Sequence, residues 1–350
     1  MTDRRTFLTG LAGGIAAAAF PGTASLSPRV PGARPDTLRP PRLRPGDLVG
    51  LVAPSGAIVD SEPAGIARES LEAMGLRVRE GAYLRQRRGY LAGTDEQRAS
   101  DLNTMIRDPE VRGIFAIRGG WGAARILDRL DYEALAHDPK VVVGYSDITA
   151  LHNAIHARTG LVTFHAPVAA STWASFPYEH FRRVVFDAEA PTLAPAPDNG
   201  DTLVPQEHRV RGIHPGRARG KLLGGNLTVL SHLVGTGFLP DFGGAVLFLE
   251  DVGEEPYRLD RMLTQLKLAG ILDGLSGFVF GRCTNCEPGG GYGSLTLEEV
   301  LMDHIAPLRI PSWFNAMIGH IRDQWTVPVG IEAEIDARAG TVRLLEPAVT

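Results

Sequence analysis

The sequence predicts an α/β fold built on a parallel sheet with helices on both faces. Short, continuously apolar segments alternate with segments whose apolar residues recur at helical spacing. Strands of this kind are typical of sheets covered on each side, because neither face meets water. At 350 residues, the chain is long enough to bury two hydrophobic cores. We therefore expect two domains.

The composition is that of an ordinary globular protein, with 44% hydrophobic and 22% charged residues. Lysine and arginine number 36 against 40 aspartates and glutamates, which gives a net charge of −4, and neither sign forms a long block. Nucleic acid and anionic membranes attract basic surfaces, so this balance gives no support to a nucleic-acid or membrane-surface role.

Residues 1–28 have the pattern of a twin-arginine signal peptide. Arg4 and Arg5 precede an uncharged, Ala/Gly-rich run from Thr9 to Phe20, and small residues around Ala24 follow. The run is too short to span a bilayer comfortably. We expect export to the periplasm and no stable membrane insertion after cleavage, with an anchored form as the alternative. Residues 29–45 are rich in proline and are expected to be a linker.

The segment 46–168 is expected to form the first α/β domain. Thr94 and Gln97 form the capping-box pattern at the start of one of its helices. Strands are expected at 48–53, 76–79, 113–117, 141–145 and 161–164, and helices at 62–74, 95–107, 123–130 and 148–157.

Residues 169–215 contain many prolines and little periodicity, which is typical of a crossing between domains. The second domain is expected over 216–350. Its predicted helices are 226–234, 259–269 and 297–304, its predicted strands are 245–249 and 277–281, and it closes with a hairpin of 332–335 and 341–345.

The segment Val141–Thr149 is the first candidate for chemistry. An apolar strand runs into a polar turn that opens a helix, and Gly144 precedes Ser146 by two residues. This is the pattern of a nucleophile elbow, although Ile148 stands where a second glycine is usual. The alternative is that Ser146 only caps the helix.

The expected strand 113–117 ends in Arg118-Gly-Gly-Trp-Gly122. Ligands of open α/β sheets bind at the carboxyl ends of the strands. Glycines there let backbone amides approach a substrate oxygen, so the amides of Gly120 and Asp147 could form an oxyanion hole. A tight turn or a phosphate cradle is the alternative.

Further candidates lie in the second half of the chain. Acidic residues, Glu250 among them, follow the expected strand 245–249, where a catalytic carboxylate or an ordinary acidic turn would fit. His320 stands out because Gly319 precedes it and no helical pattern surrounds it.

The two cysteines lie in a single Cys283-Thr-Asn-Cys286 spacing. A structural zinc site needs a second ligand pair, so we expect buried or incidental thiols rather than a zinc or redox site. The sequence offers no cluster of ligands that we assign to a metal, and we expect neither a metal nor a cofactor.

Taken together, these segments resemble the LD-carboxypeptidase family, the serine peptidases related to muramoyl-tetrapeptide carboxypeptidase and to the microcin C immunity peptidases. The likeness covers roughly Pro45 to Val349. The stretches that carry it are 46–55, 118–122, 144–149, 220–227, 249–254, 256–257, 260–261, 281–282, 319–320 and 327–330.

The resemblance implies Ser146 as nucleophile, His320 as general base and Glu250 as the carboxylate that orients it. It also implies the Gly120 and Asp147 amides as the oxyanion hole. The implied fold is a flavodoxin-like parallel-sheet first domain with a smaller, β-rich α/β second domain, and homodimers are usual in the family.

We therefore expect a serine-type carboxypeptidase that releases a C-terminal D-amino acid, D-alanine in the first instance, from peptidoglycan tetrapeptides. Arg118, Trp121, Asn226 and Tyr257 are candidates for substrate contact, or else structural. The alternatives are a peptidase or amidase that inactivates a peptide-nucleotide antibiotic, and a non-catalytic envelope protein that binds muropeptides. A metal-dependent hydrolase has less support.

Overall fold

The computed structural model describes residues 36–196, 203–204, 209–289 and 293–350. The predicted signal peptide, 1–28, lies outside these residues. The chain joins the fold before residue 46: Leu38 pairs with Leu161, and the Leu43 amide donates to the Val185 carbonyl at 3.0 Å.

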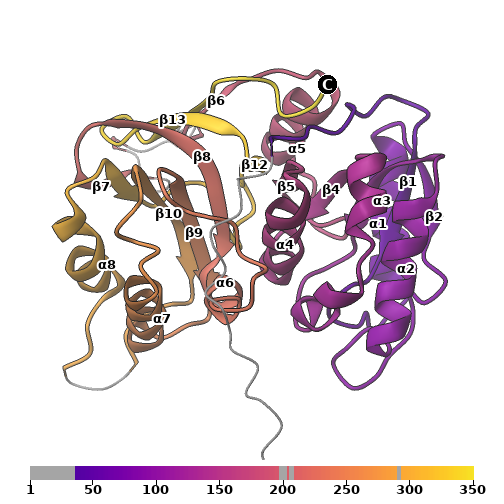
Figure 1. Cartoon of the computed structure of the whole chain (residues 1–350), viewed down its shortest axis with the longest axis horizontal. Coiled ribbons are helices and arrows are strands. Elements are labelled where there is room, and N and C mark those ends of the chain that lie inside the picture. The colour runs from indigo at the N-terminus through magenta and orange to yellow at the C-terminus, as the bar shows by residue number, and fades with distance from the viewer. Residues whose placement is uncertain (1–35, 197–202, 205–208, 290–292) are drawn as a thin grey trace, which may run out of the picture. The chain divides into compact units, whose positions relative to one another are not determined.

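The first sheet has six strands in the order β12-β5-β4-β3-β1-β2 (Figure 1). Five of them are parallel and follow the flavodoxin-like order 2-1-3-4-5, while β12 joins β5 antiparallel. Their bounds are β1 Leu48–Val52, β2 Arg77–Glu80, β3 Val111–Ala116, β4 Val141–Gly144, β5 Thr163–His165 and β12 Val327–Val329.

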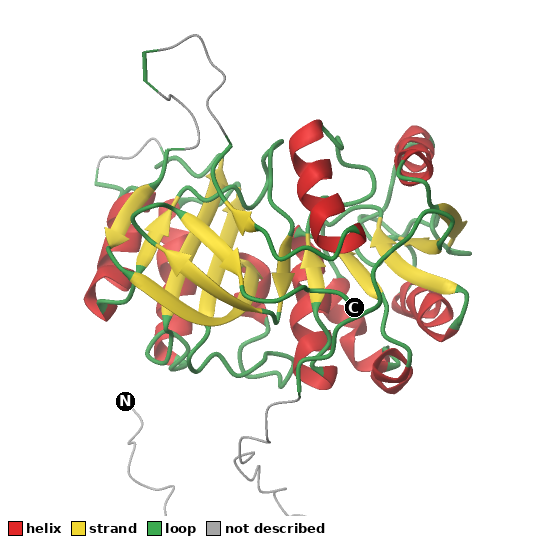
Figure 2. Ribbon diagram, turned by 90° about the horizontal axis from the view of Figure 1, so that it is seen from above, coloured by secondary structure: helices red, strands yellow, loops and turns green. Residues whose placement is uncertain are grey.

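Helices cover both faces of this sheet (Figure 2). Strand β1 shows why: Leu51 packs into the core under α1 and α5, and Val52 packs into the core under α2 and α4. The helices are α1 Glu62–Ala73, α2 Asp95–Arg107, α3 Tyr132–His137, α4 Thr149–Thr159 and α5 Ser175–Phe181, with shorter turns η1 Ala123–Arg129, η2 Ser146–Ile148 and η3 Arg182–Phe186. The predicted α/β class with a parallel sheet is confirmed.

The second sheet has eight strands in the order β6-β14-β13-β8-β9-β10-β11-β7. Its centre, β8 to β11, is parallel, and its outer pairs are antiparallel. The bounds are β6 Thr192–Leu193, β7 Arg211–His214, β8 Arg217–Asn226, β9 Val246–Val252, β10 Gly277–Thr284, β11 Ser312–Phe314, β13 Glu332–Asp336 and β14 Thr341–Leu344; α6 Leu227–His232, α7 Pro256–Leu268, α8 Leu297–Ile305 and the turn η4 Ala306–Leu308 accompany them.

Several expected elements differ from the structure. The helix at 123–130 is a 3₁₀ helix, and the helix at 259–269 begins at Pro256, a residue suited to the first helical turn. The glycine-rich strand β8 was not expected. Gly224 in β8 lies where a β-carbon would come within 1.8 Å of the Phe248 carbonyl oxygen, so a bulkier, more strand-like residue cannot stand there.

The expectation that Cys283 and Cys286 are thiols is wrong, because the structure joins them in a disulfide. The turn between them places Asn285 at a φ of +57° and brings the two α-carbons to 5.5 Å, which is within disulfide range. Spacing in the sequence did not reveal this turn.

Buried polar contacts join the two sheets where α4 meets β8. The Asn226 amide donates to Thr149 Oγ1 at 2.9 Å, and Asn153 Nδ2 donates to the Gly224 carbonyl at 3.0 Å. A β-carbon at Gly225 would lie 2.4 Å from Thr149 Oγ1. The helix that begins next to Ser146 is thereby held against the strand that neighbours Glu250.

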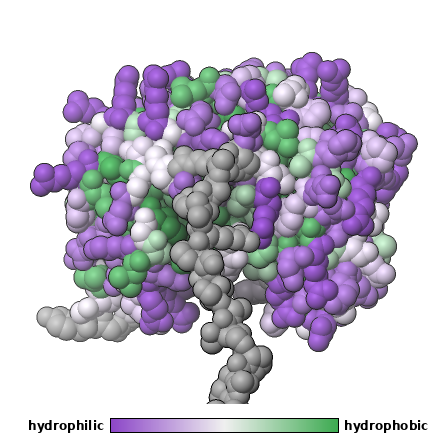
Figure 3. All heavy atoms as spheres, in the orientation of Figure 1, coloured by the Kyte–Doolittle hydropathy of each residue, from purple (hydrophilic) through white to green (hydrophobic). Residues whose placement is uncertain are grey.

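Hydrophilic side chains cover much of the face shown in Figure 3. In the described part of the chain, no helix is both long enough and apolar enough to cross a membrane.

We expect Thr149→Val to lower the free energy of unfolding by about 1–3 kcal/mol, because the buried Asn226 amide loses its acceptor. Urea unfolding measures this. The control is Thr104→Val on exposed α2 surface, where the change should stay within about 0.5 kcal/mol. Equal stability of the two variants would contradict the role of this contact.

Candidate active site

Ser146 lies at a sharp turn between β4 and α4. Its φ of +64° is in the left-handed region, which side chains other than glycine rarely adopt. Gly144 makes the turn possible, since a β-carbon there would lie 2.9 Å from Ile148 Cγ1. The Ile148 side chain therefore occupies the space beside Gly144, which explains why an elbow can form without a glycine at 148. The predicted elbow geometry is present.

His152 stabilises the turn before Ser146 by a hydrogen bond to its backbone. Its Nε2 lies 2.8 Å from the Gly144 carbonyl and must donate, because a carbonyl only accepts. The ring is buried, and burial lowers the pKa of His152 to about 4. A neutral imidazole therefore holds the strand end that precedes Ser146.

The loop after β3 packs directly on the elbow. A β-carbon at Gly119 would lie 2.8 Å from Ser146 Cβ and 3.3 Å from the Asp147 amide nitrogen, so this close approach requires glycine. Neither the Gly120 amide nor the Asp147 amide donates to any described residue. The Asp147 amide follows Ser146 directly, and Gly120 follows Gly119, the residue packed on Ser146, so both amides remain candidates for the predicted oxyanion hole.

Two buried charged groups hold that loop. The Asp147 carboxylate accepts from the Ala123 amide at 2.8 Å, and burial raises the pKa of Asp147. Arg98 donates to the carbonyls of Pro54 and Gly122 at 2.5 and 2.7 Å and also pairs with Asp95. Burial lowers the pKa of Arg98. Arg98 was missed because an arginine inside a helix pattern gives no hint of burial.

His320 and Glu250 form a hydrogen-bonded pair. Glu250 is fully buried on β9, and its Oε2 lies 2.9 Å from His320 Nδ1. A β-carbon at Gly319 would come within 2.8 Å of that oxygen, which explains the glycine before the histidine. With Nδ1 directed at a carboxylate, Nε2 is left to exchange a proton.

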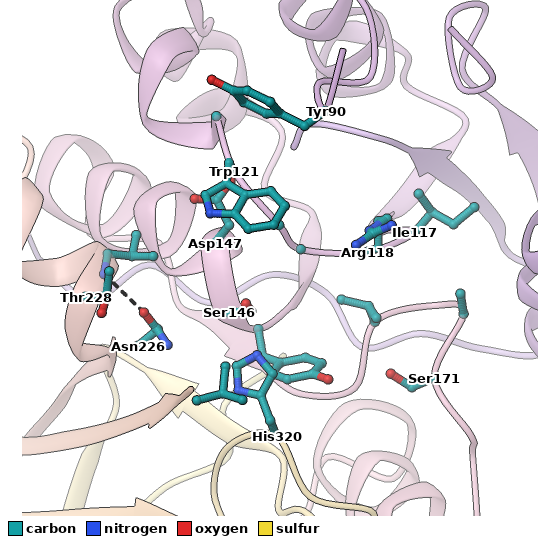
Figure 4. Close-up of a pocket in the computed structure, with 18 of the residues that line it drawn as sticks. Tyr90, Ile117, Arg118, Trp121, Ser146, Asp147, Ser171, Asn226, Thr228 and His320 are labelled. Atoms are coloured by element: carbon teal, nitrogen blue, oxygen red, sulfur yellow. Dashed lines mark hydrogen bonds between the residues drawn. The ribbon is translucent and has the colours of Figure 1, made fainter. Parts of the chain in front are cut away.

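Ser146 and His320 line the same cavity, which has a volume of 1180 Å³. Figure 4 shows Ser146 beside the imidazole of His320, with Trp121 on the other side in this view. Within the described residues, no hydrogen bond joins the Ser146 hydroxyl to His320. Catalytic hydrogen bonds are often long without substrate and tighten when it binds.

The candidates for substrate contact divide into two groups. Arg118 and Trp121 line the cavity and are exposed; Arg118 Nη1 donates to the Ala57 carbonyl at 3.0 Å, and the Trp121 ring meets Tyr90 edge to face at 6.0 Å. Asn226 also lines the cavity, but its side chain caps α6 by accepting from the Val229 amide and donates to Asp251.

The structure does not bring Tyr257 to the cavity. This residue lies in the first turn of α7 with 49% of its surface exposed, and the guanidinium carbons of Arg258 and Arg261 lie 5.6 and 5.5 Å from its ring. A position near Glu250 in the sequence is not enough, because the helix turns its side chain away.

Other cavity residues were not singled out individually by the sequence, among them Tyr145, Thr228, His232, Asp251 and Glu254. Asp251 points away from Glu250 because successive strand residues face opposite sides. It accepts from Asn226 Nδ2 and the Thr228 amide and hydroxyl. Burial raises the pKa of Asp251, and the charge of Glu250 adds to that shift. No group of three or more described His, Cys, Asp or Glu residues is placed to hold a metal ion.

A flavodoxin-like sheet, a strand-end serine and a buried carboxylate–histidine pair define a class of two-domain α/β hydrolases. Family models narrow this class: the LD-carboxypeptidase N-terminal domain matches residues 49–166, and the LD-carboxypeptidase C-terminal domain matches residues 219–335. The chain belongs to the LD-carboxypeptidase family, a family of peptidases, and the resemblance drawn from its motifs is confirmed.

Individual relatives support this family membership. A probable murein peptide carboxypeptidase of Bacillus subtilis is 38% identical over 87% of this chain and 93% of its own length. The murein tetrapeptide carboxypeptidase of Pseudomonas aeruginosa is 34% identical over 82% of this chain and 92% of its own. A solved structure of the microcin C7 self-immunity protein MccF has a TM-score of 0.80 at 24% identity and covers 89% of this chain and 100% of its own, which shows a shared fold.

Stability should depend on pH through His152. The unfolded chain protonates this ring near the ordinary pKa of 6.5, whereas in the folded protein the pKa of the ring is about 4. Below pH 6.5 the unfolded state therefore binds the extra proton, so the free energy of unfolding falls as pH drops towards 4, by up to about 1.4 kcal/mol per pH unit.

His152→Gln keeps a donor for the Gly144 carbonyl but cannot titrate. Its stability between pH 6.5 and 4, measured by urea unfolding, should fall less steeply than that of the wild type by about this amount. Parallel curves for the two proteins would contradict the assignment.

Proposed function

We propose that this protein is a serine-type LD-carboxypeptidase that releases a C-terminal D-amino acid from peptidoglycan-derived tetrapeptides. The D-amino acid that we propose is D-alanine. The observation that carries the proposal is the left-handed elbow that presents Ser146 to the same cavity as the His320–Glu250 pair. The murein peptide carboxypeptidases among its relatives support the substrate class.

The reaction begins at the Ser146 hydroxyl. His320 Nε2 accepts the proton while the oxygen attacks the carbonyl carbon of the terminal amide. Glu250 keeps His320 in the tautomer with Nδ1–H and stabilises the imidazolium that forms. The full burial of Glu250 strengthens this interaction, because no water screens the carboxylate.

The carbonyl oxygen gains negative charge as the tetrahedral intermediate forms. In this proposal the Gly120 and Asp147 amides, which have no acceptor among the described residues, donate to that oxygen. His320 then returns its proton to the leaving nitrogen, and the D-amino acid departs. Water, activated by the same imidazole, hydrolyses the acyl group on Ser146.

The substrate carries a free terminal carboxylate, and in this proposal Arg118, which lines the cavity, meets it. Only Nη1 of Arg118 has a hydrogen-bond partner among the described residues. Arg125 also lines the cavity, but Asp95 binds its guanidinium through Nε and Nη2. Charge-assisted bonds from arginine to carboxylate are strong and directional, so Arg118 suits this role.

Ser146→Ala should lower D-alanine release from a defined L,D-tetrapeptide by about 10⁴-fold or more, and Glu250→Gln by about 10³- to 10⁴-fold, because the imidazole loses its orientation. Product analysis by mass spectrometry measures both, and near-UV circular dichroism checks the fold. Turnover by Ser146→Ala at the wild-type rate would exclude the serine mechanism. Cleavage of a peptide-nucleotide substrate, with no release of D-alanine from the tetrapeptide, would favour the immunity-type alternative.

Arg118→Met should raise KM for the tetrapeptide about tenfold or more and leave KM for its C-terminal amide unchanged, because only the free carboxylate needs the cation. Arg125→Met is the matched control and should change neither value by much. Steady-state kinetics on the two substrates decide the matter. A rise for both substrates would mean that Arg118 acts on the shape of the loop rather than on the carboxylate.

A further inference from the structure

The Cys283–Cys286 disulfide lies at the end of β10, at the same end of the sheet as Glu250 on β9. Cys283 pairs with Asp251 in the register of β9 and β10, one residue after Glu250. The register shifts between Phe280 and Cys283, so the strand bulges just before the disulfide. The disulfide turn, residues 283–286, is therefore next to the strand that carries the buried carboxylate.

The disulfide turn also contacts the backbone of the proposed base. Thr284 Oγ1 donates to the His320 carbonyl at 3.1 Å. The preceding residue, Arg282, donates from its amide to the Ile318 carbonyl at 2.9 Å. These two hydrogen bonds hold the backbone on both sides of Gly319, the residue in contact with Glu250.

A third contact joins the turn to the segment that follows Glu250. The Gly253 amide donates to the Thr284 carbonyl at 2.8 Å. Thr284 therefore binds the Glu250 side of the pair through its backbone and the His320 side through its hydroxyl.

We propose that Thr284, held in place by the Cys283–Cys286 disulfide, is a positioning residue for His320. The proposal rests on the proposed function, in which His320 is the general base. The disulfide fixes both ends of a turn whose third residue, Asn285, has a φ of +57°. Without that crosslink the turn can relax, and the Thr284 hydroxyl moves relative to the His320 carbonyl.

The effect of the disulfide should be local. A crosslink between residues three apart closes a very short loop, and short loops restrict the unfolded chain less than long ones. General bases, by contrast, are sensitive to small displacements, since a misplacement of 1 Å can cost about 100-fold in rate. Loss of the disulfide should therefore change turnover more than it changes global stability.

Reduction by a dithiol follows ordinary thiol–disulfide exchange. A reagent thiolate attacks Cys283 Sγ, the more exposed sulfur, and breaks the bond to Cys286, whose thiolate takes up a proton. The second reagent thiol then closes the reagent's own disulfide ring and releases Cys283 as a thiol. The protein gains two electrons and two protons, and the dithiol loses them. The expected periplasmic location is one in which such a disulfide persists.

The first test replaces the hydroxyl. Thr284→Val should lower kcat for D-alanine release about tenfold and leave KM within about twofold, because the base moves while substrate contacts stay. Thr284→Ser keeps the hydroxyl and should restore kcat to within about threefold of the wild type. Thr159→Val is the matched control: its hydroxyl also donates to a backbone carbonyl, that of Ile155 at the far end of α4, and its loss should leave kcat unchanged.

The second test removes the crosslink. Dithiothreitol should lower the kcat of the wild type to that of Cys283→Ser/Cys286→Ser, while the double variant should not respond to the reagent. Unchanged kcat both in Thr284→Val and in the reduced wild type would overturn the inference. So would a fall in kcat that Thr284→Ser does not reverse, since the loss would then not depend on the hydroxyl.

A readout independent of turnover separates this inference from the proposed function. In protein with ¹⁵N-labelled histidine, the His320 Nδ1 proton bound to Glu250 should give a downfield NMR signal, assigned with His320→Gln. Thr284→Val should shift or broaden that signal, and Thr284→Ser should keep it. An unaltered signal in Thr284→Val overturns the inference. Full activity of Ser146→Ala, with the signal still sensitive to Thr284, means instead that only the proposed function has failed.

Discussion

The buried contact between α4 and β8 holds together the two sheets that carry the parts of the proposed site. Thr149 and Asn153 on α4 meet the backbone of Asn226 and Gly224 on β8. Helix α4 begins three residues after Ser146, and β8 pairs with β9, which carries Glu250. Through α4, β8 and β9, this contact fixes the position of one sheet relative to the other. Small residues at the contact, Gly224 and Gly225, allow a backbone approach that any side chain would prevent.

Around this contact, each proposed reacting group is held by neighbours that do not themselves react. His152 and Ile148 fix the elbow, Arg98 and the Asp147 carboxylate fix the glycine loop, and Gly319 leaves room for Glu250. Several of these neighbours are ionisable groups whose pKa is shifted by burial. Such groups are costly to bury, and their hydrogen bonds to backbone carbonyls and amides offset part of that cost.

Membership of the LD-carboxypeptidase family and the geometry of the cavity are separate arguments for the same activity, because they depend on different residues. Family matches cover both halves of the chain, whereas the cavity argument depends on a handful of atoms. The relatives named for murein peptides are more similar in sequence than the solved MccF structure, at 38% and 34% against 24% identity. Fold likeness alone would not separate these activities, since one fold supports many reactions.

Much of this protein can be predicted from the sequence because local patterns carry the information. Apolar periodicity and capping residues located α2 to the residue, and Thr94 and Gln97 form the capping box that their spacing predicts. Motifs at strand ends singled out Ser146 and Glu250, the glycine before it singled out His320, and the twin-arginine pattern is evident only in the sequence. These features depend on neighbours in the chain or on resemblance, so no tertiary contact is needed to find them.

Other features were decided only by the tertiary structure. Whether Cys283 and Cys286 meet depends on the backbone of Asn285, and whether Tyr257 faces the cavity depends on how α7 is turned. The burial of Arg98 and the partner of Asn226 depend on segments distant in the chain. These properties arise from packing between elements, and a single sequence contains no local pattern that reports which distant residues will share a surface.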